Sequence, residues 1–166
     1  MNHALGVTLI VAGIAYGTPL LIGGLGELLA ERSGILNLGL EGMMLVGAVT
    51  GFWISQILGG PSWLALIVAA LAAMVAGALM ALIHALVTIT FGGNQVVSGL
   101  ALTIFGGSVG LSSYLANIGH LGGANGRHRF PKFDILGLKH LAVFGPILFN
   151  QDLVVYVSWA LVVLVA

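Results

Sequence analysis

Uninterrupted apolar runs are the feature that most limits how this chain can fold. The longest, residues 63–91, contains no Asp, Glu, Lys or Arg. A membrane-spanning helix needs about 20 predominantly apolar residues, so this run is long enough to cross a bilayer with some tilt. Only 6% of the residues are charged, whereas a soluble domain has about 25%. The sequence therefore predicts an integral membrane protein.

The expected fold is all-α, a polytopic transmembrane helix bundle. A membrane barrel is excluded because its strands alternate apolar and polar residues, and these runs are apolar on every face. Residues 1–26 lack a basic leading region, so we interpret them as a span and not as a signal peptide. The last apolar run is shorter than a complete span, so we expect residues 1–166 to be a single transmembrane domain truncated at its C-terminus. The spans are expected at about residues 5–25, 35–58, 63–91, 94–116 and 153–166.

Turn residues and small residues refine this picture. Gly59, Gly60 and Pro61 predict a turn, and Ser62 is a good N-cap for the next helix. Small residues let helices approach closely in lipid, although glycine is also common in membrane helices generally. Taken together, the small-residue pairs favour a tightly packed bundle. The GxxxG pairs are Gly13 with Gly17, Gly47 with Gly51, and Gly106 with Gly110.

A connector at residues 117–152 separates the fourth expected span from the fifth. It combines basic residues with many apolar ones, so we expect short amphipathic pieces along the membrane interface. Its basic residues are Arg127, Arg129, Lys132 and Lys139. Alternating spans place the connector opposite the expected loop 27–34, and the excess of basic residues would put the connector in the cytoplasm.

The ionised residues cluster at residues 27–44, beside a long apolar run. Ser33, Asn37 and Glu41 are spaced so that they would share one face of a helix. A carboxylate inside a membrane helix usually faces a protein interior or a water-filled path, so Asn37 and Glu41 are candidates for lining a solute path. The alternative is a structural role, in which Glu41 pairs with a neighbouring helix.

Asn94, Gln95 and Ser98 form a second polar cluster directly after Gly92 and Gly93. They predict a discontinuous helix whose end faces a solute path. The alternative is helix capping by Asn94, which Asn does well. Capping does not require Gln95.

Two further groups have mainly structural interpretations. His84 and Thr88 share a face of the third span, where a histidine bonded to a nearby helix is favoured over a proton relay. Glu27, Glu31 and Arg32 are expected to form an ion-pair cluster at the membrane edge.

Several kinds of chemistry are not expected. The sequence contains no nucleophile–base pair, phosphate-binding loop or dinucleotide fingerprint, so the chain is not expected to be an enzyme. With no cysteine and a net charge of zero, disulfides, cysteine-based metal sites and a nucleic-acid partner are not expected. His120, His128 and His140 lack metal-ligand spacing, so no metal site is predicted.

Three motifs resemble a known family. Residues 31–48, ERSGILNLGLEGMMLVGA, resemble a signature of bacterial ABC-importer permeases of the branched-chain amino acid, simple-sugar and nucleoside group. The wording is closest to the nucleoside and simple-sugar branch. Residues 93–103, GNQVVSGLALT, are similar to a second stretch of these permeases, and residues 145–159, GPILFNQDLVVYVSW, to a third at the fifth span.

The resemblance implies a multi-pass permease subunit of the bacterial inner (plasma) membrane that carries a nucleoside or simple sugar. Its implied partners are an ABC ATPase that binds the ATP, a second permease subunit of the same or a sister chain, an extracytoplasmic solute-binding protein and the lipid bilayer. No cofactor is expected on this chain. Glu27, Glu31 and Arg32 become possible contacts for the ATPase. The family also implies a periplasmic connector at 117–152, which we favour over the local charge count.

Two rival functions stay open at this point. An ion-coupled secondary transporter would continue uptake when ATP is depleted and stop when the ion gradient collapses. A membrane scaffold without transport would leave Asn37, Glu41 and Gln95 unreachable from water on either side.

Overall fold

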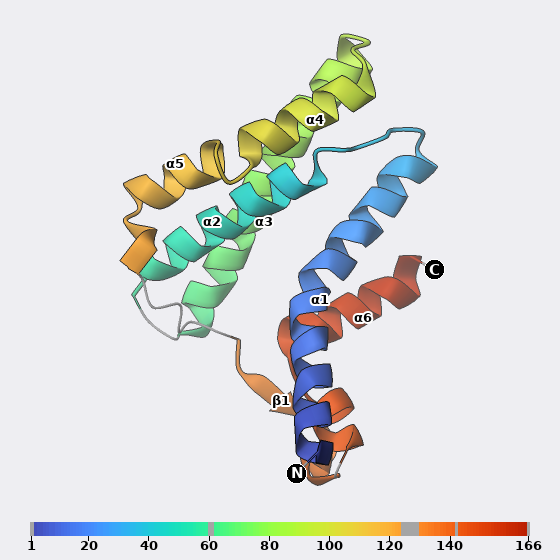
Figure 1. The fold of residues 1–166 in the computed structure, drawn as a ribbon, viewed down its shortest axis with the longest axis vertical. Helices are drawn as coiled ribbons and strands as arrows, with labels where there is room; N and C mark the ends of the chain where they lie inside the picture. Colours follow the sequence, from blue (N-terminus) through green and yellow to red (C-terminus); the bar gives the residue numbers. More distant parts are fainter. Residues whose placement is uncertain (1, 60–61, 124–129, 142, 166) are drawn as a thin grey trace. The chain divides into compact units, whose positions relative to one another are not determined.

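The structure is a computed structural model that describes residues 2–59, 62–123, 130–141 and 143–165. It divides into two compact units, one formed by Glu27–Arg129 and the other by Met1–Gly26 with Phe130–Ala166. Helix α1 (Asn2–Arg32) begins in the second of these and ends in the first. Figure 1 shows the course of the chain.

The unit Glu27–Arg129 is a set of helices around α2. Helix α2 lies against α3 most extensively and also contacts α4 and α5 (Figure 1). The buried core of this set consists of Met43, Val46, Met80 and Leu102. The elements are α2 (Leu40–Ile57), α3 (Trp63–Ala85), the π-helix η1 (Leu86–Thr90), α4 (Gln95–Gly106), α5 (Leu111–Ile118) and the 3₁₀ turn η2 (Leu121–Gly123).

Glycine allows α2 and α3 to pack closely. A Cβ atom added to Gly51 would lie 3.0 Å from the Cβ of Ala73, and one added to Gly47 would lie 3.1 Å from the Ala73 carbonyl oxygen. The predicted packing role of this GxxxG pair is therefore confirmed. Gly13 and Gly17 have no such neighbour within 4 Å among the described residues.

The start of α3 follows the sequence prediction. The Ser62 side chain accepts a hydrogen bond from the Ala65 backbone N–H at 3.1 Å, which caps the helix. Together, α3 and η1 cover residues 63–90, against a predicted span of 63–91. Of the predicted turn before Ser62, residues 60 and 61 lie outside the described residues.

The predicted boundary of the first span was wrong. Helix α1 continues through Arg32, so Glu27 and Glu31 lie in a helix and not in a loop. Helix α1 is followed by Gly34, whose φ of +84° stops the helix. The Gly34 N–H donates to Glu31 O and the Ile35 N–H to Ala30 O, which is a Schellman end. An arginine followed by a glycine near a helix end is a stop signal in the sequence.

The second and fourth spans also differ from prediction. Residues 33–39 are not helical and α2 begins only at Leu40. The predicted fourth span consists of two helices, α4 and α5, because the helix is interrupted after Gly106. Gly106 ends α4 and Gly110 precedes α5, so this GxxxG pair does not lie on one helix.

The unit formed by Met1–Gly26 and Phe130–Ala166 contains two three-residue strands that the sequence did not predict. Strands β1 (Lys132–Asp134) and β2 (Asn150–Asp152) pair antiparallel, with Phe133 opposite Gln151. Between them lie η3 (Ile135–His140) and the π-helix η4 (Gly145–Phe149), and helix α6 (Leu153–Val165) follows. These elements replace the expected amphipathic pieces. His128 and two of the four basic residues, Arg127 and Arg129, lie outside the described residues.

Gln151 organises this part of the connector. Its side chain is 2% exposed, and its amide Nε2 donates to the carbonyl oxygens of Pro146 and Ile147 at 3.0 Å each. Asp152 then caps α6 by accepting a hydrogen bond from the Val155 N–H at 3.1 Å. The fifth apolar run therefore begins where the sequence placed it.

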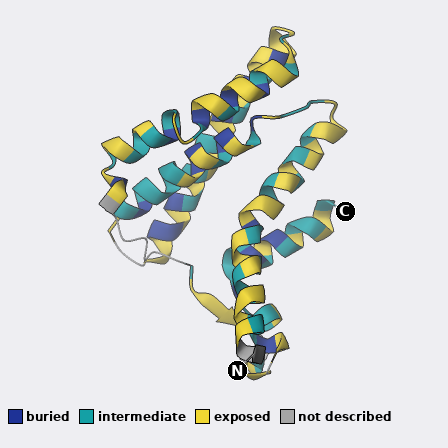
Figure 2. Cartoon of the chain, viewed as in Figure 1, coloured by how far each residue is buried: buried dark blue, intermediate teal, exposed yellow. Residues whose placement is uncertain are grey.

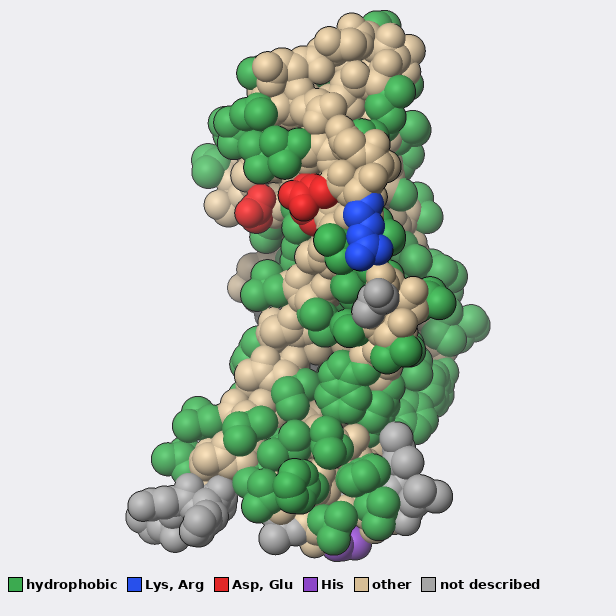
Figure 3. Space-filling model, turned by 90° about the vertical axis from the view of Figure 1, so that its right-hand side faces the viewer, with side chains coloured by type: hydrophobic (Ala, Val, Ile, Leu, Met, Phe, Trp, Pro, Cys, Tyr) green, Lys and Arg blue, Asp and Glu red, His purple; other side chains and the backbone are tan. Residues whose placement is uncertain are grey.

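Among the residues that the structure describes, four helical segments are long and apolar enough to cross a membrane: Leu5–Arg32, Leu40–Ile57, Trp63–Thr90 and Gln95–Ile118. Large apolar side chains are exposed along the helices (Figure 2). Charged side chains occupy only a small part of the face shown in Figure 3, which is otherwise mostly hydrophobic side chains and backbone. This surface suits lipid as its surroundings.

Candidate functional site

The site is built around the non-helical residues 33–39, which join α1 to α2. Leu36 is the central residue of this segment. Its backbone N–H donates to the Gln95 side-chain Oε1 at 2.7 Å, and its carbonyl oxygen lies 3.2 Å from the Nε2 atom of His84. Both partners come from the helical hairpin formed by α3, η1 and α4, so this hairpin holds the segment by side chains.

The carbonyl oxygens of Gly34 and Leu38 also accept hydrogen bonds from side chains of the hairpin. The Gln95 Nε2 donates to Gly34 O at 3.4 Å, and the Thr103 hydroxyl donates to Leu38 O at 2.6 Å. The carbonyls of residues 34, 36 and 38 therefore all bond to side chains of the hairpin. We call the three side chains of His84, Gln95 and Thr103 the polar clamp.

Glycines bring the segment close to α4. A Cβ atom on Gly99 would lie 2.7 Å from the Leu38 backbone nitrogen, closer than real Cβ contacts. A Cβ atom on Gly39 would lie 3.2 Å from the Gly99 carbonyl oxygen. Because neither glycine has a side chain, the short Thr103 hydroxyl can reach Leu38.

Residue 37 makes a different set of contacts. The Asn37 N–H donates to Glu27 Oε1 at 3.0 Å, which ties the segment to the end of α1. The Asn37 side-chain oxygen accepts from the Gly39 N–H at 3.1 Å. Among the described residues, the second carboxylate oxygen of Glu27, Oε2, is buried without a hydrogen-bond partner. The Glu27 carboxylate therefore holds the segment through one of its two oxygens.

His84 connects three parts of the chain. It is 3% exposed, and its Nδ1 lies 3.0 Å from the Ser98 hydroxyl. Because Leu36 O can only accept, Nε2 carries the hydrogen in this contact, and Nδ1 of a neutral ring accepts from Ser98. Thr88 bonds back to the His84 carbonyl oxygen at 2.8 Å. The structure thus gives His84 the bonded, structural environment that the sequence analysis favoured.

The predicted stripe of Ser33, Asn37 and Glu41 was wrong, because only Glu41 lies in a helix. Ser33 bonds locally to Ala30 O at 2.7 Å. Glu41 lies in the first turn of α2, is exposed, and accepts no side-chain hydrogen bond from the described residues. At the helix N-terminus a carboxylate is favoured by the helix dipole, so Glu41 needs no partner on a neighbouring helix.

The polar cluster of Asn94, Gln95 and Ser98 makes two kinds of contact. Asn94 caps α4, accepting from the Val97 N–H at 3.1 Å. Gln95 and Ser98 face the segment and His84. Of the edge cluster, Glu27 turns to Asn37, whereas Glu31 and Arg32 are exposed at the end of α1.

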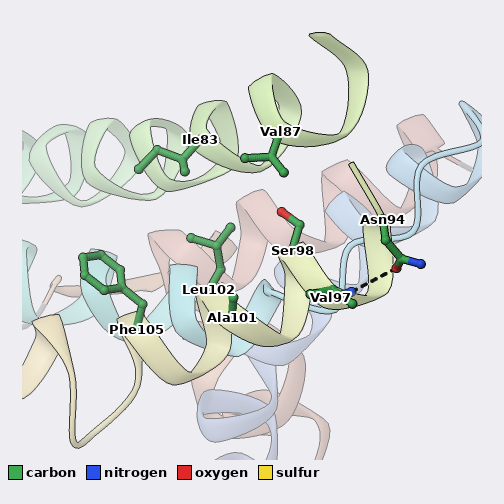
Figure 4. A pocket seen from close by; sticks show the side chains of 8 residues that line it. All are labelled: Ile83, Val87, Asn94, Val97, Ser98, Ala101, Leu102 and Phe105. Carbon is green, nitrogen blue, oxygen red and sulfur yellow. Dashed lines mark hydrogen bonds between the residues drawn. The ribbon is translucent and has the colours of Figure 1, made fainter. Parts of the chain in front are cut away.

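Residues from α3, η1 and α4 also line a groove of about 590 Å³ (Figure 4). Six of its eight lining residues are apolar, and the polar ones are Asn94 and Ser98. The Ser98 hydroxyl is already bonded to His84. A groove with so few free polar groups offers little to a solute covered with hydroxyls. Asn37, Glu41 and Gln95 are not among its lining residues.

Thr103 and Gly99 are site residues that the sequence analysis missed. Their partner, Leu38, is 65 positions from Thr103 in the chain. A threonine in a membrane helix commonly bonds within its own helix, as Thr50 does to Val46 O at 2.8 Å. No local pattern distinguishes Thr103 from Thr50.

Comparison with known proteins identifies the family. The family described as the branched-chain amino acid transport system / permease component matches residues 9–166. The chain belongs to this permease family. The resemblance, the polytopic helical fold and the multi-pass inner-membrane localisation predicted from the sequence are thereby confirmed, together with the four helices able to span a membrane.

Curated relatives of this permease chain have related names. A putative glucose ABC transporter permease protein of Haloferax volcanii is 38% identical over 95% of this chain and 46% of the relative. A guanosine ABC transporter permease protein of Bacillus subtilis is 36% identical over 86% of this chain and 45% of the relative. A nucleoside ABC transporter permease protein of Lactococcus lactis is 30% identical over 91% and 48%, respectively.

The chain spans about half the length of these curated relatives. No solved structure matches it.

Proposed function

We propose that this permease chain forms part of the membrane-spanning subunit of an ABC importer that carries a polar solute, a nucleoside or a simple sugar. The observation that supports this most is the family match over residues 9–166. The names of the relatives, which mention glucose, guanosine and nucleosides, support the solute class.

In this proposal the chain itself hydrolyses nothing. ATP binds to an ABC ATPase subunit, and the solute arrives on an extracytoplasmic binding protein. A second permease subunit, of the same or a sister chain, completes the path, which opens alternately to the two sides of the membrane. Glu31 and Arg32 are exposed at the end of α1, and we propose them as contacts for the ATPase, whereas Glu27 accepts a hydrogen bond from the Asn37 N–H.

In this proposal, a solute bonds to those candidate side chains that are not already bonded within the protein. Gln95 and Ser98 are bonded to the segment and to His84, so they are less available than the sequence suggested. The Glu41 carboxylate is exposed without a partner among the described residues, and the Asn94 amide nitrogen is not used in capping. A carboxylate and an amide suit a solute that donates and accepts hydrogen bonds. We therefore place Glu41 and Asn94 along the path. Asn37 stays a third proposed path residue, although its side chain is bonded to the Gly39 N–H and to Met43 Sδ.

Uptake of radiolabelled guanosine and glucose by cells that express the complete transporter tests this function. We expect accumulation of one of them to stop when ATP is depleted at a maintained ion gradient. Uptake that continues without ATP and stops with a protonophore would establish the secondary transporter instead. If neither solute accumulates and cysteines placed at residues 37 and 41 cannot be labelled from water, the scaffold is the better description.

Replacing Glu41 with glutamine is expected to raise the KM for the transported solute about tenfold, because one charge-assisted hydrogen bond to a solute hydroxyl is lost. The shape of the side chain and the first turn of α2 are kept. The measurement is initial uptake rate against solute concentration, at equal amounts of permease in the membrane. An unchanged KM would remove Glu41 from the path.

A further inference from the structure

The polar clamp bonds to the backbone of residues 34, 36 and 38 from two helices. We propose that His84, Gln95 and Thr103 keep residues 34–38 unwound and hold this segment to the α3–α4 hairpin, so that the two move as one body. They are positioning residues, which act on a solute only through the backbone they hold. The part of this proposal that concerns the solute rests on the proposed function.

The hydrogen bonds satisfy backbone groups of the segment. The Gln95 side-chain amide bonds to it twice, because its Oε1 accepts from the Leu36 N–H and its Nε2 donates to Gly34 O. His84 and Thr103 then satisfy the next two carbonyls on that side, at Leu36 and Leu38. Irregular backbone at membrane depth persists only where protein or water satisfies its polar groups. The clamp supplies these partners from two helices.

The segment is bonded on both sides. Four hydrogen bonds join it to α3 and α4. Three join it to α1, from the N–H groups of residues 34, 35 and 37. The close approach of Gly99 to Leu38 adds contact on the clamp side. Within the described residues, the backbone bonds of Leu36 and Leu38 all go to the hairpin, so this part of the segment follows the hairpin.

This attachment also sets the start of α2. The segment ends at Gly39, whose N–H is held by Asn37, and Glu41 follows in the first helical turn. A shift of residues 34–38 would move Asn37 and Glu41 together. The clamp thus determines where the two proposed path residues lie.

Amide hydrogen exchange of the intact permease tests the clamp without solute or ATP. Gln95→Leu removes the bonds to Leu36 and Gly34, and we expect exchange at Leu36 to accelerate about tenfold or more. Gln95→Glu keeps an acceptor for the Leu36 N–H and is expected to give a smaller acceleration. The matched control is Gln56→Leu in α2, because Gln56 Nε2 is buried and has no hydrogen-bond partner in the described part of the chain.

The graded order Gln95→Leu, Gln95→Glu, wild type supports the clamp, provided that Gln56→Leu exchanges at residue 36 as the wild type does. Equal exchange in Gln95→Leu and Gln56→Leu would overturn it. If Gln95→Leu does not fold, Thr103→Val, which removes only the bond to Leu38, provides the same comparison at residues 36–38.

Uptake kinetics test the positioning of the path. We expect Gln95→Leu to raise the KM for solute several-fold with a smaller change in kcat, and Gln95→Glu to restore part of the loss. Faster exchange with an unchanged KM would overturn the positioning of Asn37 and Glu41. A transporter that is not driven by ATP would refute the proposed function but leave the exchange result intact, so the two failures are distinguishable.

Discussion

Gly106→Ala is expected to destabilise the packing of α2 against α4 by about 3 kcal/mol, near the upper end of what overpacking usually costs. The added Cβ would lie 2.5 Å from the Gly42 carbonyl oxygen, 2.7 Å from its carbonyl carbon and 2.8 Å from its Cα. These are backbone atoms, so no side-chain rotation relieves the clash. The measurement is the free energy of unfolding of the intact permease, titrated with denaturing detergent in mixed micelles.

Gly13→Ala is the matched control for this substitution. No atom of the described residues lies within 4 Å of the Cβ that it would add in the middle of α1. Alanine is a better helix former than glycine, by up to about 1 kcal/mol, so this variant is expected to be as stable as the wild type or more stable. Equal stability of Gly106→Ala and Gly13→Ala would contradict the close approach of α2 and α4.

His84→Leu is expected to lower the free energy of unfolding by about 1–3 kcal/mol, because it leaves two partly buried polar groups without partners. These are the carbonyl oxygen of Leu36 and the hydroxyl of Ser98. Leucine occupies a similar space, so lost packing contributes little. The same detergent titration measures the effect.

Two further variants separate the polar effect from packing. In His84→Leu combined with Ser98→Ala, the stranded hydroxyl is absent, so the double variant is expected to lose less stability than the sum of the single variants. His84→Gln can donate to Leu36 O and accept from Ser98, and is expected to recover part of the stability. A strictly additive double variant would show that Ser98 and His84 are not coupled.

Local signals explain most of what the sequence predicted correctly. The Ser62 cap, the capping alternative for Asn94 and the end of η1 all depend on residues within a few positions of one another. The Gly34 stop of α1 was equally local, yet the apolar residues on both sides of it suggested a second span that began at residue 35. The helix spacing of Ser33, Asn37 and Glu41 had no physical meaning once that segment was unwound.

The candidate site was predicted in part. The sequence indicated two polar breaks, and the structure brings both together, since Gln95 binds the backbone of residues 34–36. The spacing of these residues in the sequence could not indicate which groups the polar side chains would bond to. The polar side chains of α3 and α4 face backbone groups of the segment, whereas Glu41 and the Asn94 amide nitrogen have no such bond among the described residues.

The sequence by itself determined the solvent in which this protein folds, its helical class and its permease family. Few charges and long apolar runs suit lipid as the surroundings of this chain. Lipid offers no hydrogen bonds to the backbone, and helices satisfy the backbone within each segment. Tertiary structure decided that the residues between α1 and α2 are non-helical, and which side chains bond to their backbone groups. The partners of Leu36 and Leu38 lie 59 and 65 positions away in the chain, and only the packing of α4 against α2, through Gly42 and Gly106, brings them within hydrogen-bonding distance.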